Sequence, residues 1–431
     1  MDRFSMKILF FSHESLYPVF GGHREYLEAF LNALVSDGHE CTVISWGTEQ
    51  DYVVDQGNLH LMHFCSDTVP KKIDFKSRQP DYNSPITYAA SMLGASQYLA
   101  LKNNSPDKKI EKFLLNLKDF DLILKNGPNA SKIPIRASLE SGVPLIDRLD
   151  WFGLPRTLPN RSKWMAYSGQ RVCANDVLNL RLTFFFDRVI KKRELSSITS
   201  KYVYTPTIVD YNEIIKMDKE IEADYVFPFL NEYKAEDKNI GNVPEDFCFY
   251  FASKTFSSLL TIKYLNRVTL EHENLNVIIT GNFEDIIATY DRPNFKIIGK
   301  VSLDVFWAHL RNARFVVFPS LEGHGVQMRL IRALSLGKPI IATSAICSSF
   351  TGLIDGENIL IRDTPGGFER AMLELNSDEN LRNKLSENAK KYFITDLDKR
   401  NSMNRFYVMV KKVVNEGPAY YQKRLSSSFK R

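Results

Sequence analysis

Cysteine is scarce in this chain of 431 residues, and its few cysteines form no recognisable pattern. The five are scattered along the sequence and odd in number, and no two of them have the CxxC spacing: Cys41, Cys65, Cys173, Cys248 and Cys347. Neither a disulfide framework nor a zinc site is therefore indicated. Because free thiols are typical of a reducing compartment, we expect the protein in the cytoplasm.

Long apolar runs and a strong excess of either charge are also missing. The apolar stretch Ile8–Phe11 is too short for a signal peptide, and no run reaches the roughly 20 residues of a membrane-spanning helix. The net charge is +5, with 44% hydrophobic and 25% charged residues, as in an ordinary globular protein. This mild charge permits attraction to anionic phosphates or a lipid surface, and we expect no nucleic-acid partner.

What the sequence does contain is an alternation of strand and helix patterns. Lys7–Ser12 reads as a buried strand, His23–Ser36 as an amphipathic helix and Cys41–Trp46 as a second strand. The pattern continues along the chain, which predicts an α/β protein with parallel, doubly wound sheets. Further strands are expected at 58–64, 120–124, 142–147, 187–191, 202–205, 247–251, 277–280 and 296–298, and further helices at 88–101, 108–117, 256–269, 303–312, 367–375, 379–392 and 401–414.

The length suffices for more than one domain, and one stretch suggests a boundary. Asp210–Asn242 is charged and has no sustained periodicity, so we place a linker there. We expect an N-terminal Rossmann-like domain at 1–210, a linker at 211–243, a C-terminal Rossmann-like domain at 244–400, and a last helix with a basic tail at 401–431.

The most informative stretch is Arg314–Thr343. It holds a short apolar strand at Phe315–Phe318, a segment with helical periodicity and a second short strand at Pro339–Ala342. Val326, Leu330, Ala333 and Leu334 fall on one face of a helix, which predicts that the helix begins near Val326. The stretch is therefore a strand–loop–helix–strand unit.

The loop of this unit has the residues of a phosphate site. Gly323 and Gly325 lie where the strand turns into the helix, and a helix N-terminus offers unpaired N–H groups to an anion. Glu322 lies at the carboxyl end of the strand, and Arg329 lies one turn into the helix. These residues together favour a nucleotide-sugar site over the alternative, a plain crossover whose glycines only make the turn.

The sequence PSLEGHG followed by ALSLGKPIIAT resembles the donor-site signature of glycosyltransferase family 4, whose members retain anomeric configuration and have the GT-B fold. Leu353–Leu360 is similar to the loop and strand that follow in that family. The resemblance implies two doubly wound domains facing across a cleft. It also implies a nucleotide-sugar donor and transfer with retention. Since no Asp-x-Asp motif occupies a plausible donor position, neither a metal nor another cofactor is expected.

Two positions depart from the family pattern. The spacing is closer to a branch with Gly-x-Gly-x3-Lys-x2-Glu, in which Arg329 takes the place of the lysine and Arg332 that of the glutamate. That glutamate would grip the nucleotide ribose. A histidine that reaches the donor sugar is matched here by Asp150, and we expect both Asp150 and Asp147 to be site residues.

The resemblance implies catalytic roles for Glu322, which would contact the hydroxyls of the donor sugar, and Asp150. Donor-binding residues would be Gly21, Gly22, Lys254, Gly323, His324, Gly325, Val326, Arg329, Arg332, Thr343 and Ser344, with no metal ligand among them. Simpler alternatives are open for three positions: a turn for Gly21-Gly22, a helix cap for Asp150 and a solvated loop lysine for Lys254.

We therefore expect a glycosyltransferase acting on a glycan, a lipid-linked acceptor or another hydroxyl acceptor, as in polysaccharide biosynthesis. Lys108–Leu117 has a basic amphipathic pattern, which is either an ordinary surface helix or a peripheral contact with an anionic membrane. A sugar-nucleotide epimerase on the same scaffold and a non-catalytic partner subunit of a glycosyltransferase are the alternatives.

Overall fold

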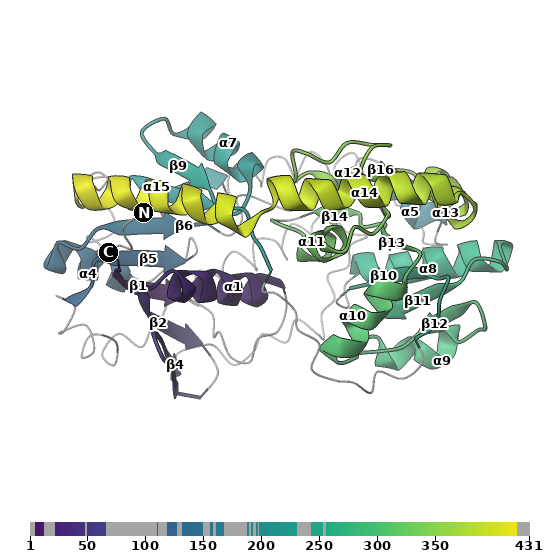
Figure 1. Ribbon diagram of the computed structural model, residues 1–431, viewed down its shortest axis with the longest axis horizontal. Helices are drawn as coiled ribbons and strands as arrows, with labels where there is room; N and C mark the ends of the chain where they lie inside the picture. The colour runs from purple at the N-terminus through teal and green to yellow at the C-terminus, as the bar shows by residue number, and fades with distance from the viewer. Residues whose placement is uncertain are drawn as a thin grey trace. The chain divides into compact units, whose positions relative to one another are not determined.

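The computed structural model divides the chain into two compact units (Figure 1). The first unit comprises 1–154, 174–229 and 399–431, and the second comprises 155–173 and 230–398. The chain therefore passes from one unit to the other four times. The structure describes residues 5–12, 22–47, 50–65, 110, 119–126, 132–149, 156–157, 161–167, 188, 191–192, 195–196, 198–230, 243–252, 256–323 and 325–419.

The first unit contains an eight-stranded sheet in the order β3-β4-β2-β1-β5-β6-β8-β9. All neighbouring strands are parallel except β3 and β4. Chain order reverses between β1 and β5, which is the switch point of a doubly wound sheet. The elements are β1 (Lys7–Ser12), α1 (Gly22–Ser36), β2 (Glu40–Gly47), β3 (Tyr52–Gln56), β4 (Leu59–Cys65), β5 (Leu122–Asn126), α4 (Lys132–Ser141), β6 (Leu145–Arg148), β8 (Tyr202–Thr205), α7 (Ile208–Met217), β9 (Glu222–Tyr225) and α15 (Lys399–Glu416).

The apolar runs of the sequence become the buried strands of this sheet. Leu9 and Phe11 are fully buried with Ile44 of β2 and Ile123 of β5 in one core cluster. The predicted strands of this region are confirmed, apart from the one expected at 187–191. There the described residues Arg188 and Lys191 are helical. The helices predicted at 88–101 and 108–117 lie outside the described residues, except for Ile110.

Helix α15 belongs to the first unit, and Figure 1 shows it, in yellow, beside β9. Phe406 packs edge-on against Phe30 of α1, with ring centroids 5.1 Å apart. Arg405 pairs with Asp224 at 3.0 Å, and Lys412 pairs with Glu222, both acidic residues of β9. Apolar packing and ion pairs thus join the end of the chain to the sheet at its β9 edge.

The predicted linker is partly regular structure. Residues within 211–243 continue helix α7, which Thr207 caps by accepting from the Asp210 amide, and form strand β9. The residues of β9 are only half-buried, and two of them are paired with α15. A half-buried edge strand has no continuous apolar run, and this explains why its pattern was not visible in the sequence.

The second unit contains a six-stranded parallel sheet in the order β12-β11-β10-β13-β15-β16. In chain order this is the doubly wound 3-2-1-4-5-6 arrangement, with its switch point between β10 and β13. The α/β, doubly wound prediction is confirmed for both units. The strands are β10 (Cys248–Phe251), β11 (Val277–Thr280), β12 (Phe295–Ile297), β13 (Phe315–Phe318), β15 (Ile340–Ala342) and β16 (Leu360–Ile361).

Helices connect these strands. They are α8 (Phe256–Glu271), α9 (Ile287–Tyr290) after a 3-10 turn (Glu284–Ile286), α10 (Leu303–Asn312), α11 (Met328–Ser335), α12 (Ser344–Cys347), α13 (Pro365–Ser377) and α14 (Glu379–Asp396). Helix α11 ends at Ser335, and Gly337, just after its C-cap Leu336, has a φ of +63° that suits glycine. A Cβ there would lie 3.0 Å from Ser386 and Lys390 of α14, so the close packing of the two helices also requires glycine.

Residues 155–173 lie in the second unit, although the sequence analysis placed them in the first domain. They contain β7 (Arg156–Thr157) and α5 (Arg161–Tyr167). Trp164 of α5 is 2% exposed and belongs to the core cluster of the second unit. One buried indole in a short helix gives no periodic signal, so only the tertiary structure reveals this excursion.

The helices that the structure describes include none with the length and apolar character needed to cross a membrane.

Candidate functional site

The switch point of the second sheet brings two helix N-termini to the carboxyl ends of two strands. Helix α8 follows β10, and α11 follows β13 through the loop 319–327. In open doubly wound sheets, ligands bind outside the carboxyl ends of the strands at this point. The stretch that the sequence singled out therefore lies at the edge where a site is expected.

Arg329 lies at this edge, in the first turn of α11. Its guanidinium donates to the Phe251 carbonyl at 3.4 Å and to Gln327 Oε1 at 3.2 Å, and it also contacts the Tyr250 hydroxyl. It lies 5.6 Å from the ring centroid of Phe318. No carboxylate among the described residues pairs with it. Arg329 is thus a half-buried cation held by long neutral contacts, at the ends of both β10 and β13.

Aromatic rings line this edge beneath the two arginines of α11. Phe251 packs edge-on against Phe318 and Phe306, with centroids 5.3 and 4.9 Å away. The guanidinium of Arg332 lies 5.4 Å from the Phe306 centroid. Burial lowers the pKa of Arg332 to about 10, which leaves it a cation near neutral pH. The rings therefore hold both guanidinium groups by cation–π contacts, a role suited to arginine.

Hydroxyl groups fix the loop after β13 to helix α8. Thr261 Oγ1 donates to the Pro319 carbonyl at 3.0 Å, and Ser257 Oγ accepts from the Leu321 amide at 3.2 Å. Ser257 and Ser320 also lie within hydrogen-bond distance of each other, at 3.3 Å. The start of the site loop is therefore tied to the first turns of α8.

The turn into α11 has the geometry that the glycines predicted, but the helix begins later. Gly325 has φ +54°, and its carbonyl accepts from Ser349 Oγ. The helix starts at Met328, with Gln327 at the N-cap, so Val326 precedes it. The Gln327 side chain does not cap the first turn; it accepts from Arg329 instead. The amides of that turn are consequently left uncapped by this side chain.

Thr343 and Ser344 follow β15, the next strand of the sheet beyond β13. Thr343 Oγ1 donates to the Ser320 carbonyl of the site loop. The Ser344 amide donates to Asp363 Oδ1 at 2.7 Å, at the start of α12. Both residues thus lie at the carboxyl edge, and the buried Thr343 binds the loop directly.

Glu322 and Gly323 form the two-residue strand β14, and its partner is β7 of the excursion. The pairing is antiparallel, with Glu322 opposite Thr157 and Gly323 opposite Arg156. The backbone at Glu322 is therefore held by a segment that is about 165 residues away in sequence. This partner was not foreseen, because two residues carry no strand pattern.

The loop after α12 is fixed by its own polar side chains. Asn358 Oδ1 accepts from the Ile354 amide, and its Nδ2 donates to the Gly352 carbonyl, both at 2.8 Å. Asp355 Oδ1 accepts from the Ile361 amide at 2.8 Å. In Leu353–Leu360, the polar residues that resemble the family therefore shape the loop.

The structure joins some of the predicted residues and leaves others undescribed. Gly323, Gly325, Val326, Arg329, Arg332, Thr343 and Ser344 lie in or beside the loop 319–327 and helix α11. Gly22 is the first residue of α1 in the first unit. Gly21, Asp150, Lys254 and His324 lie outside the described residues, as does the side chain of Glu322.

Asp147 occupies a structural position in the first unit. One carboxylate oxygen lies 2.6 Å from Lys125 Nζ, and the other accepts from the Thr199 and Ser200 amides at 2.9 and 2.8 Å. Both side chains of the pair are 2% exposed. These contacts use the carboxylate to join β5, β6 and the turn before β8, so they do not support the site role expected for Asp147.

Three residues at the site were missed by the sequence analysis. Ser257, Ser320 and Asp363 hold the loop and the start of α12, as described above. A serine at the start of a helix and polar residues directly after a strand are common signals for the carboxyl edge. Such signals are too frequent along the chain to identify these three without the fold.

Known proteins are similar to this chain in the same region, which contains β13, α11 and the loop between them. Residues 257–378 match the family "Glycosyl transferases group 1". Two uncharacterized glycosyltransferases of Methanocaldococcus jannaschii are 28% identical over 135 residues and 26% identical over 155 residues. These segments cover 31% and 33% of this chain, and only 36% and 38% of the two relatives.

Solved structures resemble nearly the whole chain. Sucrose-phosphate synthase of Thermosynechococcus elongatus has a TM-score of 0.65 at 12% identity, and the match covers 95% of this chain and 100% of that one. HepE of Anabaena, in complex with UDP and glucose, has a TM-score of 0.56 at 12% identity, over 94% and 100%. At this identity the likeness shows the fold. Together with the two doubly wound units it gives the chain the GT-B fold, and residues 257–378 are similar to the group 1 glycosyl transferases.

Proposed function

We propose that this protein transfers a sugar from a nucleotide-sugar to a hydroxyl acceptor. One observation carries the proposal: Arg329 lies in the first turn of α11 at the switch point, with no carboxylate of the described residues paired to it. A cation and uncapped helix amides at one edge suit a diphosphate. The donor diphosphate would rest there, against the start of α11.

The chemistry of sugar transfer favours a cation such as Arg329 beside the diphosphate. Breaking the bond between the anomeric carbon and a phosphate leaves a positive sugar and an increasingly negative diphosphate. Preorganised donors that face developing charge lower the barrier to such a step. Arg329, the amides of α11 and Lys254 would stabilise the leaving diphosphate, so no metal is required for that task.

The remaining residues of the loop would hold the sugar and the nucleotide. Glu322 would accept hydrogen bonds from the sugar hydroxyls, with Gly323 and His324 beside it. Thr343 and Ser344 would lie near the nucleotide. Asp150 and Gly21-Gly22 belong to this proposal as further residues for the donor. Retention of the anomeric configuration belongs to this proposal as well.

The acceptor is proposed in broader terms. It is a hydroxyl group on a glycan, a lipid-linked sugar or another molecule, as in polysaccharide biosynthesis. The structure of HepE is a complex with UDP and glucose, and a TarM structure is a complex with UDP and two saccharide-containing ligands. These two complexes favour a uridine diphosphate sugar as the first donor to test. We also propose that the protein acts in the cytoplasm and contacts the membrane surface.

Incubation of the full chain with a panel of nucleotide-sugars tests the proposal. Acceptor-dependent release of nucleoside diphosphate is the expected result. An isomerised sugar without release would indicate an epimerase instead. No binding of any donor by saturation-transfer NMR would indicate a non-catalytic partner subunit and would overturn the proposal. That alternative rests on Arg332, a cation at the position of the ribose-binding glutamate in the family pattern that the sequence resembles.

A further inference from the structure

The excursion 155–173 contacts the candidate site from two directions. Strand β7 pairs with β14, the strand that contains Glu322. Helix α5 places Trp164 against the segment after β16, where its indole Nε1 donates to the Asp363 carbonyl at 2.9 Å. The side chain of the same Asp363 accepts from the Ser344 amide at 2.7 Å. One short segment thus reaches Glu322 by a strand pairing and Ser344 through a single aspartate.

Trp164 is the anchor of this segment in the core of the second unit. Its ring lies edge-on to Tyr264 and Phe368, with centroids 4.8 and 5.7 Å away. The indole is 2% exposed, and its hydrogen bond to the half-buried Asp363 is partly shielded from water. Large buried aromatic side chains of this kind contribute strongly to holding an element in place.

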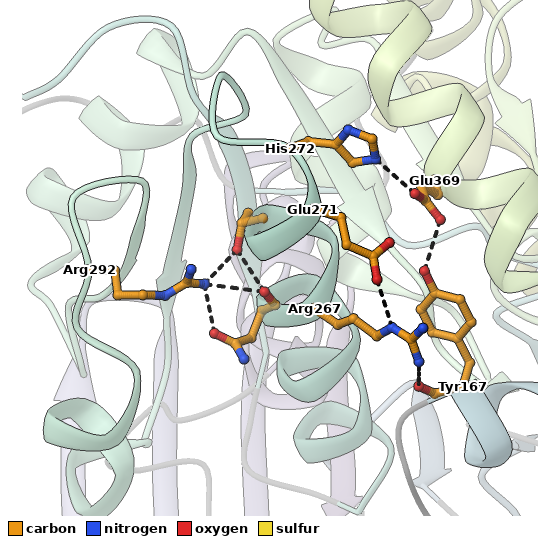
Figure 2. A network of polar contacts seen from close by, with 8 residues as sticks. Tyr167, Arg267, Glu271, His272, Arg292 and Glu369 are labelled. Carbon is orange, nitrogen blue, oxygen red and sulfur yellow. Dashed lines mark hydrogen bonds and ion pairs between the residues drawn. The ribbon is translucent and has the colours of Figure 1, made fainter.

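A polar clamp holds the other end of α5 (Figure 2). The Tyr167 hydroxyl donates to Glu369 Oε2 at 2.9 Å, and the guanidinium of Arg267 lies 4.3 Å from the Tyr167 ring centroid. Arg267 also donates to the Tyr167 carbonyl at 3.0 Å. Burial, together with the contact to Glu369, raises the pKa of Tyr167 to about 12, so the hydroxyl stays a donor near neutral pH. The end of α5 is therefore bonded to both α8 and α13.

Glu271, His272 and Glu369 already pair with other side chains of the second unit. Glu271, His272 and Glu369 have ligand atoms within 4.8 Å of one another, a spacing that suits a metal ion. Glu271 however pairs with Arg267 at 3.0 Å, and Glu369 lies 2.8 Å from His272 Nε2. Because a metal would have to break these contacts, the group is better explained as an anchor for α5.

We propose that Trp164 is a positioning residue for the site: it seats residues 155–173 so that β7 fixes the backbone of Glu322 and Asp363 fixes the start of α12. The value of this arrangement for sugar transfer rests on the proposed function; the positioning itself does not. A segment that belongs to the first half of the chain thereby becomes part of the donor edge of the second unit.

Hydrogen–deuterium exchange of the full chain tests the positioning without any substrate. Trp164→Phe keeps an aromatic ring and removes the N–H donor, and Thr157→Pro disturbs the backbone pairing of β7 with Trp164 unchanged. In each variant, the amides beside the removed contact should exchange roughly five- to tenfold faster, which is the effect of losing one backbone-type hydrogen bond. Exchange should be faster in peptide 341–348 of Trp164→Phe and in peptide 319–327 of Thr157→Pro. Because we propose that Trp164 seats β7, exchange in peptide 319–327 should also be faster in Trp164→Phe.

Arg292→Met is the matched control in the same unit. Arg292 donates to Asn266 and Thr269 at 2.8 Å (Figure 2), and it has no hydrogen bond or ion pair with the described residues of the excursion or of β14. Its loss should lower the melting temperature of the second unit and leave exchange at 319–327 and 341–348 unchanged. Wild-type exchange in both peptides in Trp164→Phe, or equal acceleration in Arg292→Met, overturns the proposal.

Binding of UDP, ADP and GDP to the same variants separates the two proposals. Faster exchange together with weaker nucleotide binding supports both. Faster exchange in a protein whose wild type binds none of the three leaves the positioning role intact and counts against the proposed function. Unchanged exchange removes the positioning role, whatever the protein binds.

Discussion

The cations at the carboxyl ends of the two sheets have different partners and different burial. In the first unit, Lys125 at the end of β5 is fully buried and lies 2.6 Å from the Asp147 carboxylate. In the second unit, Arg329 is half-buried and makes contacts of 3.4 and 3.2 Å to neutral oxygens, with a ring beside it. Both cations lie beside a switch point of the same type of sheet, so topology alone does not distinguish them.

This difference indicates which edge is built for a ligand. A buried ion pair with further amide donors has its charge satisfied within the fold, and its removal is costly. A cation that neutral groups hold in place retains its attraction for an added anion. Among the described residues, the second edge is therefore the better candidate for a phosphate, and substitutions at the two edges should have different consequences.

The largest expected effect is on stability in the first unit. Lys125→Met leaves the buried Asp147 carboxylate without its cation and should lower the free energy of unfolding by about 3–5 kcal/mol. Urea denaturation measures this loss. Arg136→Ala, which breaks an exposed pair with Glu140, is the control and should change it by only about 0.5 kcal/mol or less. Equal effects of the two variants would contradict the comparison.

Next in size is the loss of Glu322. If its carboxylate contacts the donor sugar, Glu322→Ala should abolish measurable transfer, a fall of at least about 100- to 1,000-fold. The melting temperature should change little, because the pairing of β14 with β7 involves the backbone. Acceptor-dependent release of nucleoside diphosphate is the measurement. Transfer at the wild-type rate would remove Glu322 from the site.

Arg329→Ala should have a smaller effect, confined to the donor. Removing a charge-assisted contact to a phosphate costs about 1.5–3 kcal/mol, which is roughly a 10- to 150-fold rise in the dissociation constant. Titration calorimetry with UDP measures it, and increased salt should weaken binding to the wild type more than to the variant. If Arg329→Ala instead lowers the free energy of unfolding as much as Lys125→Met does, Arg329 serves the stability of the fold and not the binding of a phosphate.

Arg332→Glu tests specificity. The substitution exchanges a cation on the Phe306 ring for a carboxylate of the kind that could accept hydrogen bonds from a ribose. We expect the relative affinities for UDP, ADP and GDP to change by up to about tenfold, the size of one hydrogen bond. An unchanged order of the three nucleotides would show that Arg332 does not face the nucleoside.

The smallest expected effect is that of metal removal. If the cations of the chain alone stabilise the diphosphate, EDTA should leave the transfer rate unchanged, and added Mg²⁺ should not raise it. A rate that falls with EDTA and returns with Mg²⁺ would contradict the metal-independent part of the proposal.

Much of the fold follows from local patterns. The strand at Phe315–Phe318 and the helix at Leu303–Asn312 are predicted to the residue, because an apolar run and an amphipathic period are local properties. Strand β9 is not predicted, since its half-buried residues are paired with α15, far along the chain. Helix α11 starts two residues later than predicted, because Val326 continues the apolar period into the turn that Gly325 makes.

The sequence by itself determined that two α/β sheets form, and that Glu322, the glycines and Arg329 lie in one strand–loop–helix unit, because all of these are near neighbours in the chain. Only the tertiary structure decided that Asp147 is bound by Lys125, that Arg329 lies against Phe251 and Phe318, and that residues 155–173 support the loop from the second unit. Such contacts join residues that are tens to more than a hundred positions apart, and their energies depend on burial and distance, which no local pattern specifies.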